Sequence, residues 1–156
     1  MDDTTPDHPG VIAFPPFIYG IPWAVGLVLH LVFPVHVLPS FVARALGAAL
    51  TLCAVILAVV GRRAMARAGT DPNPTKPTTA LVVAGPFRFT RNPLYVSLTG
   101  LYVGLSLLVN TLWPLVLLPG VLFVMQRGVI DREERYLERK FGDDYRRYKA
   151  QVRRWI

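Results

Sequence analysis

The sequence predicts an all-α fold, an integral membrane bundle of about four transmembrane helices with amphipathic helices at the C-terminal end. Apolar residues make up 53% of the 156 positions and charged residues only 17%, whereas about a quarter of a soluble domain is charged. The mean hydropathy is positive, at +0.40. The apolar residues also gather in long runs, as membrane spans require. A chain of this length favours one domain over two.

Two apolar runs occupy the N-terminal part of the chain. The first extends from about Phe17 to Leu38 and the second from Phe41 to Val60, with a short turn at Pro39 and Ser40. At about 1.5 Å per residue, the first run reaches roughly 33 Å, which is enough to cross a hydrocarbon core. The second run is rich in small residues between Gly47 and Gly61, which favours close packing against another helix.

A proline-rich connector follows these spans. Residues 69–79 read GTDPNPTKPTT, and prolines at this density exclude a helix and predict an extended, solvated segment. The single domain, residues 1–156, is therefore expected in three parts. Two N-terminal spans occupy 1–68, the connector occupies 69–79, and a C-terminal core occupies 80–156.

The C-terminal core contains two further spans and an amphipathic tail. Asn92 and Pro93 predict a helix start, with asparagine as the N-cap and proline at the first helical position. A third span then extends from about Leu94 to Val109, and a fourth from Leu112 to about Ile130. Beyond it, apolar side chains recur at helical spacing among charged ones. Gly142 interrupts this pattern and predicts two short helices.

The distribution of basic residues predicts how the chain is oriented in the membrane. The net charge of +7 would indicate nucleic-acid binding in a soluble protein, but here the basic residues flank apolar runs, so we expect no nucleic-acid partner. Four spans put 16 of the 17 Lys and Arg residues on one side and leave Arg44 alone on the other. The positive-inside rule then places both termini, the connector and the polar clusters of the core in the cytoplasm.

The sequence predicts no metal centre. Cys53 is the single cysteine, so an intrachain disulfide and a cysteine-cluster metal site are excluded. The three histidines are scattered over the N-terminal quarter. Glycine-rich phosphate loops and nucleophile elbows are also missing from the sequence.

Two polar clusters are expected to meet at one membrane face. The first is Gly85–Tyr95, where the free N–H groups of a helix start could receive a carboxylate and Phe87 offers a flat surface for an aromatic ring. The second begins at Asp131, and its Glu133 and Glu134 offer charge to a cationic group. Together they suit a zwitterionic, nucleotide-like ligand. The spacing alone is equally consistent with charged residues that only surround the bundle at the membrane interface and bind no ligand.

The two clusters also carry a family resemblance. TALVVAGPFRFTRNPLY, a helical hairpin and EERYLERKFGDDYRRYKAQVRRW together resemble the isoprenylcysteine carboxyl methyltransferase family and the related phospholipid methyltransferases. The likeness extends from about Thr79 to Trp155, and the family's Arg-His-Pro appears here as Arg91-Asn92-Pro93. It implies S-adenosylmethionine as cofactor and methyl transfer to a hydrophobic acceptor embedded in the membrane.

The resemblance assigns roles to individual residues. Those implied to bind the cofactor are Leu81, Val82, Phe87, Arg91, Asn92, Pro93, Tyr95, Gly100, Leu101 and Glu133. Glu133 would hold the cofactor's ammonium group, and Glu134 is the candidate catalytic residue facing the acceptor. The isoprenylcysteine branch positions its acceptor with an arginine where this chain has Val129, and Arg127 or Arg132 could substitute for it.

Two other functions stay open from the sequence. Membrane sterol reductases have a related C-terminal region that binds NADPH, although this chain has fewer spans than that family usually has. A non-catalytic protein with the same fold, acting as a lipid-binding module or a partner, is the second alternative. The acceptor is also open between an isoprenylcysteine-like carboxylate and another lipid.

Overall fold

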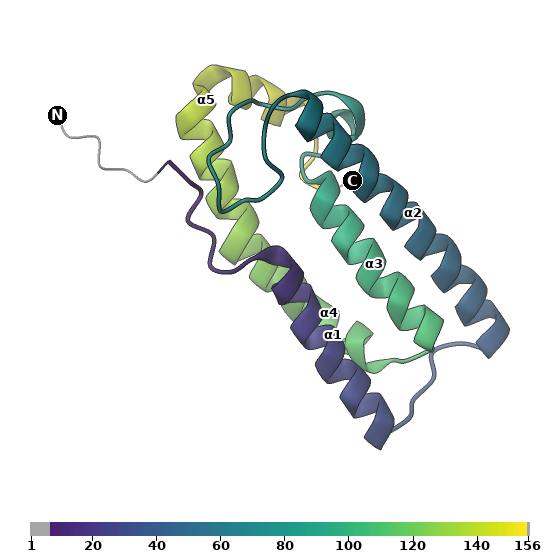
Figure 1. The fold of residues 1–156 in the computed structure, drawn as a ribbon. Helices are drawn as coiled ribbons and strands as arrows, with labels where there is room; N and C mark the ends of the chain where they lie inside the picture. The colour runs from purple at the N-terminus through teal and green to yellow at the C-terminus, as the bar shows by residue number, and fades with distance from the viewer. Residues whose placement is uncertain (1–6, 156) are drawn as a thin grey trace.

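The chain folds as a helical bundle with a polar cap (Figure 1). The structure is a computed structural model that describes residues 7–155, and no strand occurs within them. The elements are α1 (Pro15–Val32), α2 (Ser40–Arg67), the short 3₁₀ helix η1 (Gly85–Arg88), α3 (Pro93–Val109), α4 (Trp113–Met125), the π-helical η2 (Gln126–Ile130) and α5 (Asp131–Gln151). The predicted all-α class is confirmed.

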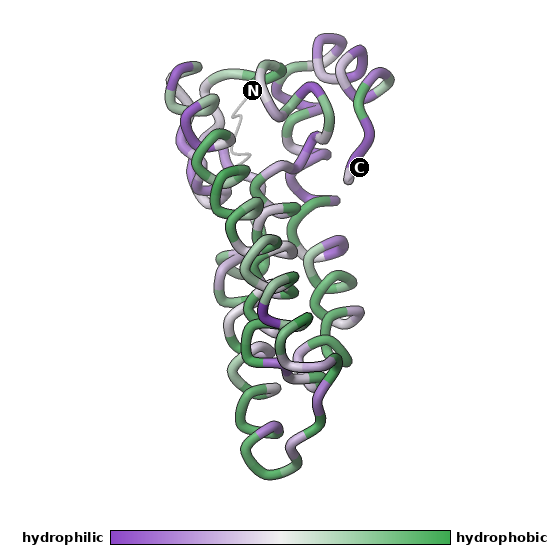
Figure 2. Tube along the Cα trace, turned by 90° about the vertical axis from the view of Figure 1, so that its right-hand side faces the viewer, coloured by the Kyte–Doolittle hydropathy of each residue, from purple (hydrophilic) through white to green (hydrophobic). Residues whose placement is uncertain are grey.

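The bundle has the dimensions and the surface of a membrane protein. The helices α1 and α2 and the helix that runs from α4 through α5 each contain an apolar stretch long enough to cross a bilayer, and α3 is a shorter apolar helix. Large apolar side chains on the bundle are exposed, among them Leu31, Phe41 and Leu52, at 76%, 84% and 61%. Figure 2 shows this apolar shaft, with most polar segments gathered at one end. Because so much exposed apolar surface suits lipid and not water, the chain is an integral membrane protein.

The first helix ends within the first apolar run. Helix α1 ends at Val32 and not at Leu38, because Pro34 cannot continue the helical hydrogen-bond ladder. The segment that follows is bound by Asn110, at the end of α3. The Asn110 side chain donates to the Leu38 carbonyl (2.8 Å) and accepts two backbone N–H groups of the same segment (3.1 and 3.2 Å).

The second span is longer than predicted. Helix α2 continues past Gly61 to Arg67, which the good helix formers Arg, Ala and Met in its last turns favour. The glycine is a contact point and not a stop signal, since a Cβ at Gly61 would lie 3.0 Å from a methyl group of Leu94 on α3. The end of α2 therefore reaches the start of α3, where the polar cap begins.

Small residues bring α2 and α3 together along their length. A Cβ added at Gly47 would lie 2.6 Å from the backbone nitrogen of Leu108, and one added at Gly104 would lie 2.9 Å from that of Thr51. Only glycine permits this approach, so the prediction that the second span packs closely through small residues is confirmed. Helix α1 packs on α4 and α3 instead, which leaves α3 between α1 and α2.

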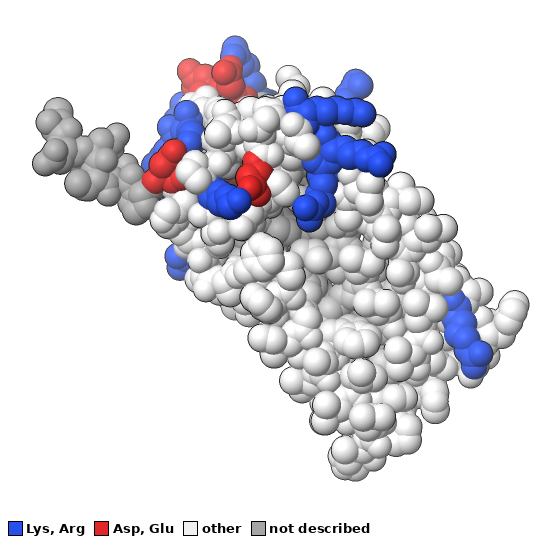
Figure 3. Space-filling model, viewed as in Figure 1, with Lys and Arg blue, Asp and Glu red and all other residues white. Residues whose placement is uncertain are grey.

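The C-terminal half of the chain forms one long, bent helix. The apolar α4 passes into α5 through η2, a π-helical segment of the kind often found near functional sites. The predicted break at Gly142 is confirmed, because its φ of +53° and ψ of −123° are non-helical and turn the end of α5 aside. Figure 3 shows acidic and basic side chains crowded over the α5 end of the molecule.

Candidate functional site

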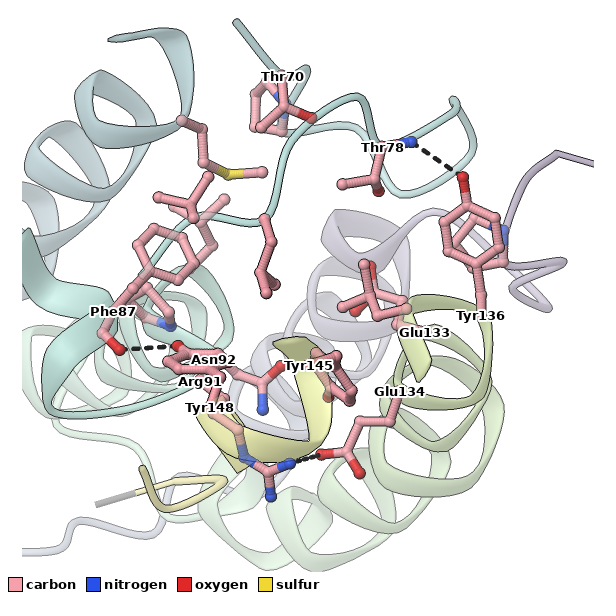
Figure 4. Close-up of a pocket in the computed structure, with 18 of the residues that line it drawn as sticks. Thr70, Thr78, Phe87, Arg91, Asn92, Glu133, Glu134, Tyr136, Tyr145 and Tyr148 are labelled. Atoms are coloured by element: carbon pink, nitrogen blue, oxygen red, sulfur yellow. Dashed lines mark hydrogen bonds and ion pairs between the residues drawn. The ribbon is translucent and has the colours of Figure 1, made fainter. Parts of the chain in front are cut away.

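A pocket lies in the polar cap, where the connector, the start of α3 and the first turns of α5 meet (Figure 4). The structure brings together in its lining nine of the residues singled out from the sequence. These are Leu81, Val82, Phe87, Arg91, Asn92, Pro93, Tyr95, Glu133 and Glu134. The two polar clusters thus face each other across one cavity, although forty residues separate them in the chain.

Four other residues singled out from the sequence do not line this pocket. Gly100 faces α2, where an added Cβ would lie 3.0 Å from the Cβ of Ala54, and Leu101 follows it further into the bundle. Arg132 points outward and donates to the carbonyl of Gly10 (2.8 Å). Arg127 is exposed on η2.

Glu134 is held in a buried ion network. Arg154 donates to it with Nε at 2.8 Å from Oε1 and with Nη2 at 2.5 Å from Oε2. Arg91 Nη1 lies 3.1 Å from Oε1, and both the Arg91 and Glu134 side chains are at most 10% exposed. Two-pronged arginine contacts of this kind fix a carboxylate in one orientation. Glu134 is therefore engaged by this chain's own arginines.

Glu133, the next residue, has a different environment. Its Oε1 accepts one hydrogen bond, from the Tyr95 hydroxyl (2.8 Å), and no lysine or arginine of residues 7–155 forms an ion pair with it. Burial raises the pKa of Glu133 to about 7, with a smaller rise from the nearby charge of Glu134, while the Tyr95 hydrogen bond opposes both. The carboxylate is thus desolvated and faces the pocket without a cation.

The C-terminal segment closes the base of the pocket. Asn92 is the residue before α3, as predicted, but its side chain does not cap that helix. Its Nδ2 donates instead to the carbonyl of Arg154 (2.9 Å), and the backbone N–H of Arg91 donates to the carbonyl of Arg153 (2.9 Å). Residues beyond α5 therefore run alongside the start of α3 and position it.

Two tyrosines from the helically spaced apolar positions of the C-terminal tail, Tyr145 and Tyr148, also line the pocket. The Tyr148 hydroxyl donates to the carbonyl of Phe87 (2.7 Å), and the Tyr145 ring lies beside that of Tyr148, with 6.3 Å between the ring centroids. Both are buried. The sequence signal for these tyrosines was their helical spacing, which puts them on one face of the last helix. That face packs against the first polar cluster, Gly85–Tyr95. Arg154 carried no comparable signal.

The outer side of the pocket is covered by two segments that meet at Tyr136. Its hydroxyl accepts the backbone N–H of Thr78 in the connector (3.1 Å) and donates to the carboxylate of Asp7 (2.8 Å). Lys140 adds an ion pair to Asp7 at 2.6 Å. Pro9, from the same N-terminal segment, contributes to the lining. The pocket is thus walled by the connector and the N-terminal segment as well as by helices.

Arg91 retains donors that the described residues do not use. Its Nε and Nη1 are buried and have no hydrogen-bond acceptor within residues 7–155, because the 3.1 Å approach of Nη1 to Glu134 lacks hydrogen-bond alignment. Buried donors of this kind are costly unless something accepts from them. In the same part of the chain, no group of three His, Cys, Asp or Glu residues is arranged to hold a metal.

Comparisons with known proteins give the family. The family model described as phospholipid methyltransferase matches residues 42–144, from α2 into α5. An uncharacterized protein of Haemophilus influenzae is 51% identical to this chain over 57 residues, which is 33% of this chain and 90% of that protein. No solved structure matches. Since the family model spans well over half of the chain, including the residues of both polar clusters that line the pocket from Leu81 to Glu134, the protein belongs to the phospholipid methyltransferase family of membrane methyltransferases.

Proposed function

We propose that this protein transfers a methyl group from S-adenosylmethionine to a hydrophobic acceptor embedded in the membrane. The observation that carries the proposal is the pairing, in one pocket, of a carboxylate without a cation and a guanidinium with unused donors. Glu133 is complementary to an ammonium group and Arg91 to a carboxylate. The cofactor's amino-acid end carries both groups on one carbon.

The rest of the pocket suits the remaining parts of the cofactor. Phe87, Tyr145 and Tyr148 line the pocket and offer aromatic surface to an adenine ring. When bound, the cofactor supplies a sulfonium methyl that passes to a lone pair of the acceptor, while the electrons of the broken carbon–sulfur bond remain on sulfur as a thioether. The positive charge disperses in this step, so the protein need not provide a strong acid or base.

The chain's contribution is then orientation and exclusion of water. Glu133 and Arg91 fix one end of the ligand, and the Tyr136 contacts hold the connector and the N-terminal segment over the pocket. Holding two reacting groups in line can supply several kcal/mol of a barrier, on the order of 7–11 in favourable cases. The polar cap would lie in the cytoplasm, where the cofactor is made, with the apolar bundle in the bilayer.

Binding in detergent solution tests the proposal. Calorimetry should show saturable binding of S-adenosylmethionine and of its demethylated product, and both should raise the melting temperature of the protein. NADPH should do neither, which separates this function from a reductase. Absence of binding for both forms of the methyl cofactor would reject the proposal in favour of a non-catalytic role.

The acceptor is a separate question with its own experiment. The family description favours a phospholipid, and an isoprenylcysteine-like carboxylate is the second candidate. Membranes containing the protein would be incubated with methyl-labelled cofactor, and the lipid and protein fractions analysed by mass spectrometry. Label in an amine-bearing lipid supports the first acceptor class, and base-labile label on protein supports the second.

A further inference from the structure

A second hollow adjoins the pocket at the membrane boundary. It is a groove of about 270 Å³ between the start of α1, the last turns of α2 and the first turns of α3. Its floor is formed by α3, with Tyr95, Ser97 and Leu98, and its sides by Phe14 of the segment before α1 and Ala58 of α2. Helices α1 and α2 pack on α3 but not closely on each other, which leaves the groove open toward the lipid.

The groove and the pocket share a wall. Pro72, Leu94 and Tyr95 line both hollows, so that Tyr95 separates them while its hydroxyl binds Glu133 (2.8 Å). A molecule in the groove is therefore closest to the pocket at this shared wall. The shared wall makes the groove a part of the same site and not an unrelated surface crevice.

The groove is polar at one end and apolar along its depth. Arg62, at the end of α2, and Asp71 and Asn73 of the connector lie at the polar end, while Ala58 and Leu98 lie a turn deeper along their helices. This gradient matches a molecule with a polar headgroup and a hydrocarbon chain, oriented as it would be in a bilayer.

From these observations we infer that the groove between α1 and α2 holds a hydrocarbon chain of the acceptor lipid and delivers the acceptor's reactive end to Tyr95. The inference rests on the proposed methyl transfer. It assigns the acceptor side to Phe14, Ala58, Ser97 and Leu98. Arg127 and Arg132, which the family resemblance offered for this role, line neither hollow.

Photo-crosslinking tests the occupant directly. The full chain would be placed in nanodiscs that contain phosphatidylethanolamine with a diazirine close to the headgroup end of one acyl chain, and the crosslinked peptides identified by mass spectrometry. Leu98 lies on the floor of the groove, beside the buried Ser97, so crosslinks to Leu98 report a chain inside the groove. We expect such crosslinks, and their absence would overturn the inference.

A matched pair of variants controls for nonspecific lipid contact. Ala58→Phe fills the groove and should lower crosslinking to its floor at least fivefold. Ala49→Phe places the same ring on the opposite face of α2, since nine residues correspond to about two and a half turns, and Ala49 is exposed. This variant should leave the yield unchanged. Equal yields in the two variants would contradict the inference.

The remaining readouts separate folding from function. Ala58→Leu is a smaller filling variant that should give an intermediate decrease if Ala58→Phe does not fold. Crosslinking requires no methyl transfer, so it reports on the groove even if calorimetry finds no cofactor binding. Cofactor affinity should be unchanged in Ala58→Phe, whereas loss of that affinity would show that the variant disturbs the pocket and would count against a distinct acceptor groove.

Discussion

Two neighbouring glutamates belong to walls of the pocket that are built in opposite ways. Glu134 belongs to a braced wall, which we define as Glu134, Arg91 and Arg154, where arginines fix the carboxylate. Glu133 belongs to an open wall, Glu133 and Tyr95, where one hydroxyl is the partner. Successive helical residues point about 100° apart, so a single turn of α5 serves both walls. The comparison separates a carboxylate that this chain's own arginines neutralise, Glu134, from a carboxylate left for a ligand, Glu133.

The largest expected effect comes from breaking the braced wall. Glu134→Ala leaves the buried Arg91 without its carboxylate and removes one of the two carboxylate partners of Arg154, which keeps Asp131 (3.2 Å). The free energy of unfolding should therefore fall by about 3 kcal/mol. The measurement is reversible unfolding in mixed micelles. Glu138→Ala is the control, because Glu138 pairs with Arg146 and Lys149 at the surface and such pairs contribute about 1 kcal/mol or less. Similar losses in the two variants would refute a distinct structural role for Glu134.

A substitution in the open wall should weaken cofactor binding and leave the stability of the free protein intact. Glu133→Gln keeps the shape and the contact with Tyr95 but removes the charge, so cofactor affinity should fall about 10- to 100-fold, or roughly 1.4–2.8 kcal/mol. The melting temperature of the free protein should not fall, since a desolvated carboxylate is replaced by a neutral group. Calorimetry and thermal unfolding check the two halves of this prediction. An unchanged affinity would remove Glu133 from the ligand site.

The pKa of Glu133 predicts a pH dependence of that binding. With a pKa of about 7, the carboxylate becomes protonated as the pH falls from 8 to 6, and affinity for a cationic group should decrease about tenfold. The free energy of unfolding should change in the opposite direction and rise as the pH falls. The raised pKa means that the folded state binds more protons than the unfolded state, so this group's contribution is lost as the pH rises from about 4.5 to 7. Both trends should disappear in Glu133→Gln.

The overall fold could be predicted where local sequence determined it. Runs of apolar residues gave the four helices of the bundle, and Gly142 gave the break in α5. Helix α1 ends before Pro34, which is itself a local signal, and Asn110 then binds the segment that follows. The predicted end of α2 was wrong, because Gly61 packs on Leu94 without ending its helix. The π-helical turn η2 has no local sequence signal, and its Gly128, Val129 and Ile130 are buried.

The candidate site shows the same division. Arg91 and Asn92 precede a helix start, and Glu133 stands in an acidic cluster, so all three could be singled out from short stretches of sequence. Arg154 could not, because it reaches Glu134 only after the chain has turned at Gly142. Among the many basic residues of the tail, nothing local distinguishes it. The same holds for Tyr136, whose partners Thr78 and Asp7 lie in segments far away in the sequence.

The smallest expected effect concerns the cover over the open wall. Tyr136 lies one turn beyond Glu133 on α5, and Tyr136→Phe removes the acceptor of the Thr78 amide and the donor to Asp7. We expect a loss of about 1 kcal/mol in stability and cofactor dissociation faster by up to about fivefold, measured by stopped-flow displacement. Tyr102→Phe is the matched control, because its hydroxyl donates to the Pro114 carbonyl (2.8 Å) within the bundle. That variant should lose similar stability and leave dissociation unchanged. If both variants release the cofactor equally fast, the cover does not retain the ligand and the open wall alone sets its lifetime.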